Sequence, residues 1–198
     1  MVHVADHHIS PGKKLWTWGN AEFGYAWDRE LTNADGPYVE LMAGVYTDNQ
    51  PDFSWLQPYE TKTFEQYWYP IREIGPAKNA NRRVAVNLEI EDQRVRLGVS
   101  VTEPFVHATV SIAAQGEILL ERTVDLAPDM PFVEEASLPD GVAGEDCVLR
   151  VLSEQGDELI RYASEEAGET PLPEPATEPP LPHEIHTIEE LYLTGLHL

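Results

Sequence analysis

Glu40 is the residue of this chain whose setting best suits acid–base chemistry. It lies between Val39 and Leu41 in a short run of strand formers, and a carboxylate held on a rigid strand suits the removal of a proton from a sugar hydroxyl. Asn49 and Gln50 follow it, and their amides are groups that hydrogen-bond sugar hydroxyls. We predict Glu40 as a general base and the two amides as sugar-binding residues. The alternative is that Glu40 is only the solvent-facing residue of an alternating strand.

All five tryptophans lie before residue 70, together with six of the eight tyrosines. Indole rings stack on the apolar faces of pyranose rings, and neighbouring carboxylates bond the sugar hydroxyls. The further candidates for sugar binding are Trp16, Trp18, Trp27, Asp28 and Trp55. Because Trp16 and Trp18 point to the same face of a predicted strand, they share one role. The alternative is that most of these rings fill a core between two sheets.

The pair His7–His8 beside Asp6 raises the question of a metal site. If this stretch continues the strand before it, adjacent side chains point to opposite faces and chelate one ion poorly. We therefore predict no metal site, and we predict no cofactor. We also interpret His107 as a solvated surface residue and Cys147 as an inert core residue in an apolar strand.

The elements that carry these residues are predicted to be strands and long loops. Within residues 1–75 the strand formers concentrate at 2–4, 15–18, 38–42 and 61–69, and glycines separate them. No helix is predicted in this region.

Residues 82–163 show a clearer pattern of apolar and polar residues in alternation, which is typical of half-buried strands. Glycines between paired strands, at Gly116 and Gly156, predict hairpin turns. About seven short strands at this spacing predict a two-sheet sandwich of the immunoglobulin or fibronectin kind. The predicted strands are 84–90, 95–101, 106–112, 118–126, 132–138, 147–152 and 158–163.

Residues 164–184 contain six prolines, six glutamates and neither lysine nor arginine, which predicts an extended, mobile linker. A capping-box pattern, Thr187-Ile-Glu-Glu190, then predicts a helix with Ile188, Leu191, Tyr192 and Leu196 on one face. Such a stripe needs a covering partner, so we expect the chain to be part of a longer protein.

Composition and charge limit the partners. The formal net charge of −22 argues against nucleic acid and anionic membranes as partners, and no apolar run reaches the length of a membrane helix. A single cysteine excludes an internal disulfide and fits a reducing compartment, so we expect a cytoplasmic protein. Exposed apolar surface, where a partner sheet is missing, would favour self-association.

Three stretches, at residues 3–6, 11–19 and 35–62, resemble those of a known protein family. The last two read "PGKKLWTWG" and "DGPYVELMAGVYTDNQPDFSWLQPYETK". They resemble a bacterial family of unknown function whose members join a mutarotase-like β-supersandwich to tetratricopeptide repeats. The resemblance implies that residues 1–78 are the C-terminal portion of a sugar-enzyme-like supersandwich, and that 185–198 begin the helical repeat region. The sandwich of residues 79–163 and the linker of 164–184 lie between them.

More distantly, residues 38–71 resemble the last strands of aldose 1-epimerases, the galactose mutarotases. Glu40 falls on that family's catalytic base, which removes the proton of the anomeric hydroxyl. Residues 49–51 fall on its Asn-Gln-Pro, and 58–60 replace its Pro-Gly-Glu with Pro-Tyr-Glu. The resemblance implies a base role for Glu40, whereas the family's acid histidines lie in an earlier part of the fold and have no counterpart here.

The fold class expected is therefore all-β: part of a supersandwich, an immunoglobulin-like sandwich, a Pro/Glu-rich linker and a short helix. The function expected is that of a fragment of a carbohydrate-binding or aldose-epimerase-like protein, with protein partners through downstream repeats and no turnover of its own. The alternative, from a different class, is a structural spacer or protein-interaction module without sugar chemistry.

Overall fold

The computed structural model describes residues 1–46, 56–139, 141–163 and 180–197. Contacts within the chain divide it into two units, Met1–Glu165 and Glu166–Leu198, and each is described by itself. In the first unit the strands are β1 (Val2–Ala5), β2 (Lys13–Thr17), β3 (Val39–Ala43), β4 (Gln66–Tyr69), β5 (Asn79–Ala80), β6 (Val84–Glu91), β7 (Arg94–Val101), β8 (Phe105–Ala114), β9 (Glu117–Leu126), β10 (Phe132–Ser137), β11 (Cys147–Leu152) and β12 (Glu158–Ala163).

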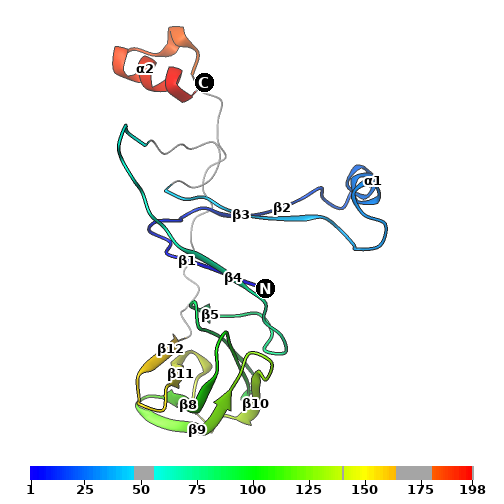
Figure 1. Cartoon of the computed structure of the whole chain (residues 1–198), viewed down its shortest axis with the longest axis vertical. Helices are drawn as coiled ribbons and strands as arrows, with labels where there is room; N and C mark the ends of the chain where they lie inside the picture. Colours follow the sequence, from blue (N-terminus) through cyan, green and yellow to red (C-terminus); the bar gives the residue numbers. More distant parts are fainter. Residues whose placement is uncertain (47–55, 140, 164–179, 198) are drawn as a thin grey trace. The chain divides into compact units, whose positions relative to one another are not determined.

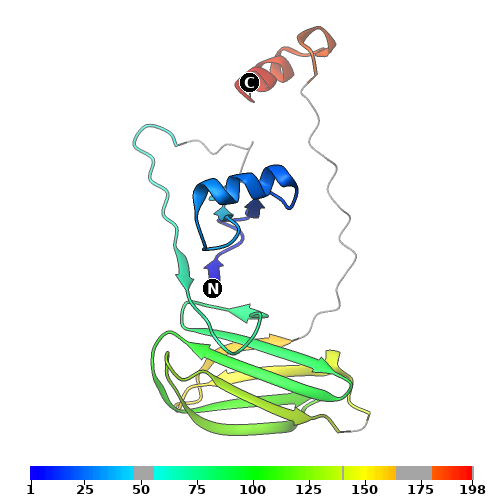
Figure 2. The same ribbon diagram turned by 90° about the vertical axis from the view of Figure 1, so that its right-hand side faces the viewer.

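The predicted sandwich is confirmed. Strands β5 to β12 form two four-stranded antiparallel sheets, with the orders β10-β7-β6-β5 and β12-β11-β8-β9 (Figures 1 and 2). The chain crosses between the sheets after β7, β9 and β10, which is the kind of connection found in immunoglobulin-like sandwiches. Among the described residues of this region, the one helical segment is a single 3₁₀ turn, η1 (Gly144–Asp146).

The sandwich core follows from the alternation in its strands. Inward-facing residues such as Val86 on β6 and Leu149 on β11 are fully buried in one cluster that both sheets share. The turn residues Gln115 and Gly116 both have positive φ, 52° and 87°, as a two-residue hairpin turn requires. Cys147 is buried in this core, as predicted, and burial raises the pKa of its thiol.

The alternation fails at one place in β8. The pattern predicts that Val106 faces inward, but Val106 is exposed, because the register of β8 on β9 shifts between Phe105 and Ala108. His107, inside this bulge, has a φ of 49°. It is exposed, as predicted, and its Nδ1 lies 3.1 Å from Oε1 of Glu154.

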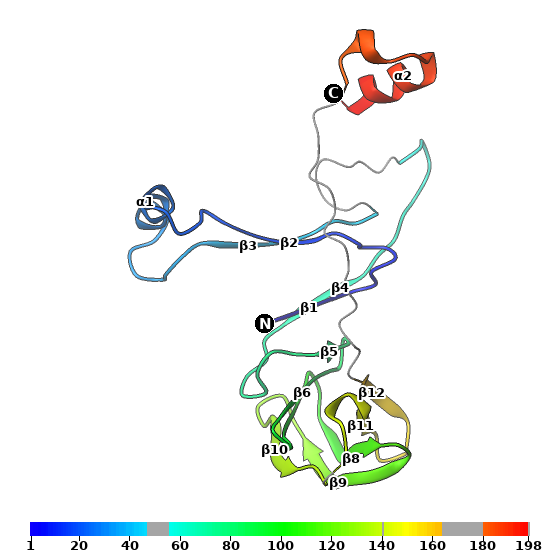
Figure 3. The same cartoon turned by 180° about the vertical axis from the view of Figure 1, so that it is seen from behind.

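The outer face of the first sheet is covered by the segment that precedes β5. Ile74 is fully buried there in a cluster with Val2 and Ala85. Gly98 on β7 leaves the space for it, since a Cβ at Gly98 would lie 2.6 Å from Cβ of Ile74. The buried Asn87 amide donates to the Ile74 carbonyl at 2.7 Å. Strands β1 and β4 pair antiparallel next to this segment (Figure 3). Val2 of β1 packs in the same cluster, so the N-terminal region contacts the sandwich.

A helix in the N-terminal region corrects the prediction of strands and loops alone. Helix α1 (Glu22–Leu31) lies between β2 and β3. Phe23, Tyr25 and Trp27 alternate as in a strand, but Phe23, Trp27 and Leu31 also fall four residues apart, on one face of a helix. The helical spacing is the one that the chain adopts. The strand predicted at residues 61–69 is shorter than expected, since β4 begins at Gln66.

The second unit contains a 3₁₀ turn, η2 (Pro182–Glu184), and helix α2 (Ile188–His197). The predicted N-terminal cap is confirmed, because Thr187 Oγ1 accepts the backbone N–H of Glu190 at 3.1 Å. Ile188 and Tyr192 on this helix are largely exposed. Most of the predicted linker, residues 164–179, lies outside the described part of the chain. No helix among the described residues is long and apolar enough to cross a membrane.

Candidate functional site

Glu40 lies on a two-stranded hairpin formed by β2 and β3. In the antiparallel register Glu40 is paired with Trp16, so the two side chains project from the same face about 5 Å apart at Cβ. The flanking Val39 and Leu41 are exposed rather than buried. The hairpin thus places the predicted base beside a predicted stacking ring.

Helix α1 folds back onto the end of β2 because residue 24 is glycine. A Cβ at Gly24 would lie 2.4 Å from the carbonyl oxygen of Gly19 and 2.6 Å from that of Trp18. Gly24 is accordingly the buried residue of the helix. This close approach stacks the Trp27 ring on the Trp18 ring, with centroids 4.7 Å apart and planes 11° apart.

Five rings from β2, α1 and the start of β3 form one group, which we call the aromatic cluster: Trp16, Trp18, Phe23, Trp27 and Tyr38. Trp16 meets Trp18 edge to face at 4.6 Å and Tyr38 at 6.4 Å, and Phe23 lies 6.2 Å from Trp18. These are ordinary separations for attractive ring pairs. Trp16 remains 37% exposed and Trp27 40% exposed. In this chain the cluster is therefore a partly exposed surface on one hairpin and helix.

Two carboxylates border the aromatic cluster through Tyr38. Glu40 Oε1 accepts the Tyr38 hydroxyl at 2.9 Å, and Asp28 Oδ1 accepts the Tyr38 backbone N–H at 3.1 Å. The hydrogen bond to Glu40 raises the pKa of the Tyr38 hydroxyl. The indole N–H of Trp18 is buried and has no acceptor among the described residues. The site thus combines apolar ring faces with hydrogen-bonding oxygens at their edge.

The structure brings together five of the eight predicted site residues, and the other three lie outside the described part of the chain. Trp16, Trp18, Trp27, Asp28 and Glu40 meet at the aromatic cluster, whereas Asn49, Gln50 and Trp55 fall within residues 47–55. Sequence reasoning missed Phe23 and Tyr38 as members. The four-residue spacing of Phe23 and Trp27 was the signal that could have found the first.

The arrangement suits binding better than proton transfer. Ring faces and carboxylate oxygens recognise a sugar by stacking and hydrogen bonds. A base needs its oxygen within hydrogen-bonding reach of the proton that it removes. Here Oε1 of Glu40 already accepts the Tyr38 hydroxyl, so a substrate hydroxyl would have to displace it or use the other oxygen.

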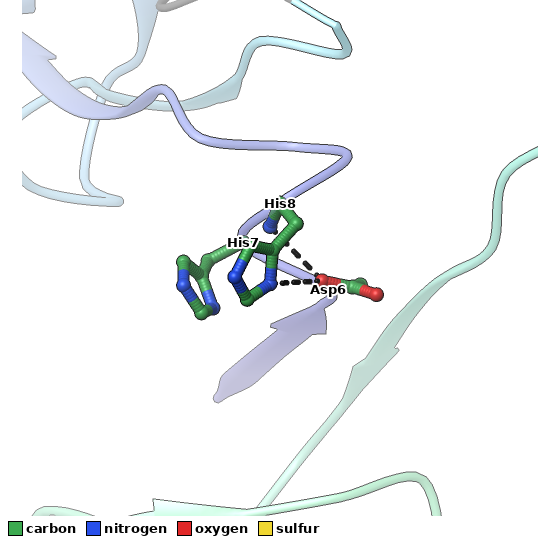
Figure 4. A group of neighbouring side chains, drawn as sticks. All are labelled: Asp6, His7 and His8. Atoms are coloured by element: carbon green, nitrogen blue, oxygen red, sulfur yellow. Dashed lines mark hydrogen bonds and ion pairs between the residues drawn. The ribbon is translucent and has the colours of Figure 1, made fainter.

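The histidine pair near the N-terminus does not continue strand β1. The prediction of no metal site assumed that it did, and this assumption was wrong. Strand β1 ends at Ala5, and His7 and His8 lie in the turn that follows it. Side-chain donor atoms of Asp6, His7 and His8 all lie within 4.8 Å of one another (Figure 4). The backbone N–H of His8 donates a hydrogen bond to the Asp6 carboxylate, and this bond lowers the pKa of Asp6.

Comparison with known proteins finds two family models that match consecutive segments of the first unit. The family model of the second domain of YphG-like proteins matches residues 79–162, which is the sandwich. The model of a domain of unknown function, DUF5107, matches residues 1–71, which hold the aromatic cluster and the histidine pair. No solved structure matches the chain. The chain is thus similar, in consecutive segments, to an uncharacterised domain family and to the second domain of a YphG-like protein.

Proposed function

We propose that the aromatic cluster is a carbohydrate-binding surface, and that this chain binds sugar without turning it over. The observation that carries the proposal is the exposure of stacked indoles beside hydrogen-bonding carboxylates. Buried rings would contribute only packing, but Trp16 and Trp27 keep over a third of their surface exposed. A pyranose ring matches such a face, since its C–H face is apolar and its hydroxyls lie at the rim.

An aldose-epimerase-like reaction in a longer protein is the finer form of this proposal. Its support is the resemblance of residues 38–71 and the pairing of Glu40 with Trp16. Replacement of Glu40 by Gln separates the two forms. Loss of a general base would cost about 10² to 10⁴ in rate, whereas loss of one charged hydrogen-bond acceptor costs about 1–3 kcal/mol of affinity.

The experiment is a glycan array with the full 198-residue chain, followed by titration of any glycan that binds. We expect Trp27→Ala to weaken binding roughly tenfold or more, equivalent to about 1.4 kcal/mol. The matched control is Trp68→Phe, because Trp68 has a similar exposure, 43%, but stacks on His3 away from the cluster. No binding to any glycan, or equal losses in the two variants, would overturn the proposal.

The second candidate is a spacer that presents helical repeats to protein partners. It is favoured by the exposed apolar residues of α2, among them Ile188 and Leu193. We propose it as the function that remains if the glycan array is negative. Both candidate functions are compatible with the cytoplasmic location that we propose from the single cysteine.

A further inference from the structure

We propose that Asp6, His7 and His8 bind one divalent transition-metal ion, of which Zn²⁺ is the probe. The proposal is independent of the carbohydrate surface. Two imidazoles and one carboxylate form a donor set that suits zinc, and a water would complete a four-coordinate site. The three side chains come from consecutive residues of one turn.

The separations between the donor atoms fit this coordination. With metal–ligand bonds of about 2.0–2.2 Å, two ligands of a tetrahedral zinc site lie about 3.3–3.5 Å apart. Nδ1 of His8 lies 3.3 Å from Oδ1 of Asp6. A ring nitrogen of His7 lies within 4.8 Å of one donor atom on each of the other two residues. All three side chains are exposed, so a change in the torsion angles of His7 could close the remaining gap.

The rings and the carboxylate already gather on one side of the turn. The centroids of the His7 and His8 rings lie 3.8 Å apart. Figure 4 shows the two rings next to each other, with the Asp6 carboxylate facing the His8 ring. A simple surface ion pair joins only Asp6 and His8. A shared ion uses all three residues.

The backbone of the turn is fixed before any ion binds. The Asp6 carbonyl accepts the N–H groups of Ile9 at 3.1 Å and Ser10 at 2.7 Å, and the Asp6 side chain accepts the N–H of His8 at 2.9 Å. Ser10, which is 2% exposed, donates its hydroxyl to the Gly44 carbonyl at 2.7 Å. With both ends of the turn held, binding requires side-chain ordering only, which lowers its entropic cost.

The test is calorimetric titration of Zn²⁺ into the full chain prepared without a histidine tag. We expect one ion per chain. His7→Ala and His8→Ala should each weaken binding by at least about tenfold, because even residues that only support a zinc ligand cost 10–100-fold when lost. Asp6→Asn keeps the acceptor oxygen for the His8 N–H and removes the charge, and it should weaken binding in the same sense.

The matched control is His107→Asn, because His107 also lies beside a carboxylate, at 3.1 Å from Glu154, but among the described residues it belongs to no group of three metal-ligating side chains within 4.8 Å of one another. This variant should bind Zn²⁺ as the parent does. Zn²⁺ should also raise the thermal unfolding temperature of the parent and of His107→Asn, and not that of His8→Ala. Absence of binding, unchanged affinity in the His7 or His8 variant, or an equal loss in His107→Asn would overturn the proposal.

Discussion

A methyl group added at Gly24 would disturb the contact between helix α1 and strand β2 that holds the aromatic cluster together. Ordinary contact begins at 3.4 Å, and a Cβ at this position would lie 2.4 Å from the Gly19 oxygen. The added Cβ would clash with the backbone carbonyl oxygens of Gly19 and Trp18. Because neither is part of a flexible side chain, α1 has to move by about 1 Å. Gly24→Ala would gain about 1 kcal/mol of helix propensity but lose about 1–3 kcal/mol to overpacking. We expect a net destabilisation of the hairpin–helix contact.

Exciton coupling between neighbouring indoles in the far-ultraviolet circular dichroism spectrum reports this contact, because the Trp18 and Trp27 rings lie 4.7 Å apart. Gly24→Ala should weaken the couplet and lower the urea concentration at which it disappears. The control is Gly195→Ala, also within a helix, where an added Cβ meets nothing within 4 Å. That variant should leave the couplet intact. If Gly24→Ala kept the full intensity of the couplet, and the couplet disappeared at the same urea concentration as in the parent, the reasoning would be refuted.

Three further changes test the sandwich and its outer face. Gly98→Ala places a Cβ 2.6 Å from Cβ of Ile74 and should cost about 1–3 kcal/mol in the free energy of unfolding; an unchanged urea midpoint would contradict it. Asn87→Ala removes a buried 2.7 Å donor to the Ile74 carbonyl, which also accepts from Arg96, and should cost about 0.5–1.5 kcal/mol by the same measurement. The hydrogen bond to Glu154 raises the pKa of His107 above its ordinary 6.5, so the pair stabilises the fold fully below about pH 6.5 and loses this contribution as the pH rises through the raised value. The urea midpoints of the parent and of His107→Asn should therefore draw closer as the pH rises above 6.5, and a difference that does not change with pH would count against the pair.

The sandwich could be predicted from sequence because its strands bury one face, and burial imposes a period of two on apolar residues. The seven predicted strands correspond to β6–β12. The exception was Val106, whose side chain is exposed by a bulge. A bulge adds one residue to one strand only, and nothing in the local pattern of a single strand shows whether its partner has the matching residue.

The candidate site was harder to predict because it depends on a helix that the pattern left ambiguous. Phe23, Tyr25 and Trp27 satisfy a period of two, and Phe23, Trp27 and Leu31 a period of four. The choice is made by the contact of Gly24 with the backbone of residues 18 and 19, which is a tertiary feature. Likewise, the turn at His7 and His8 depends on hydrogen bonds to Asp6, which the alternation of apolar and polar residues does not show.

The two candidate sites differ in part in what holds them. The turn of Asp6 to His8 follows a strand paired with β4, and Ser10 also ties it to the Gly44 carbonyl, directly after β3. The aromatic cluster rests on β2 and β3, which form a two-stranded sheet of their own, and an isolated hairpin is only marginally stable. Any sugar that binds the folded cluster must therefore raise the stability of this hairpin and helix by mass action. The rise should appear in the Trp18–Trp27 couplet, with the sandwich transition unchanged.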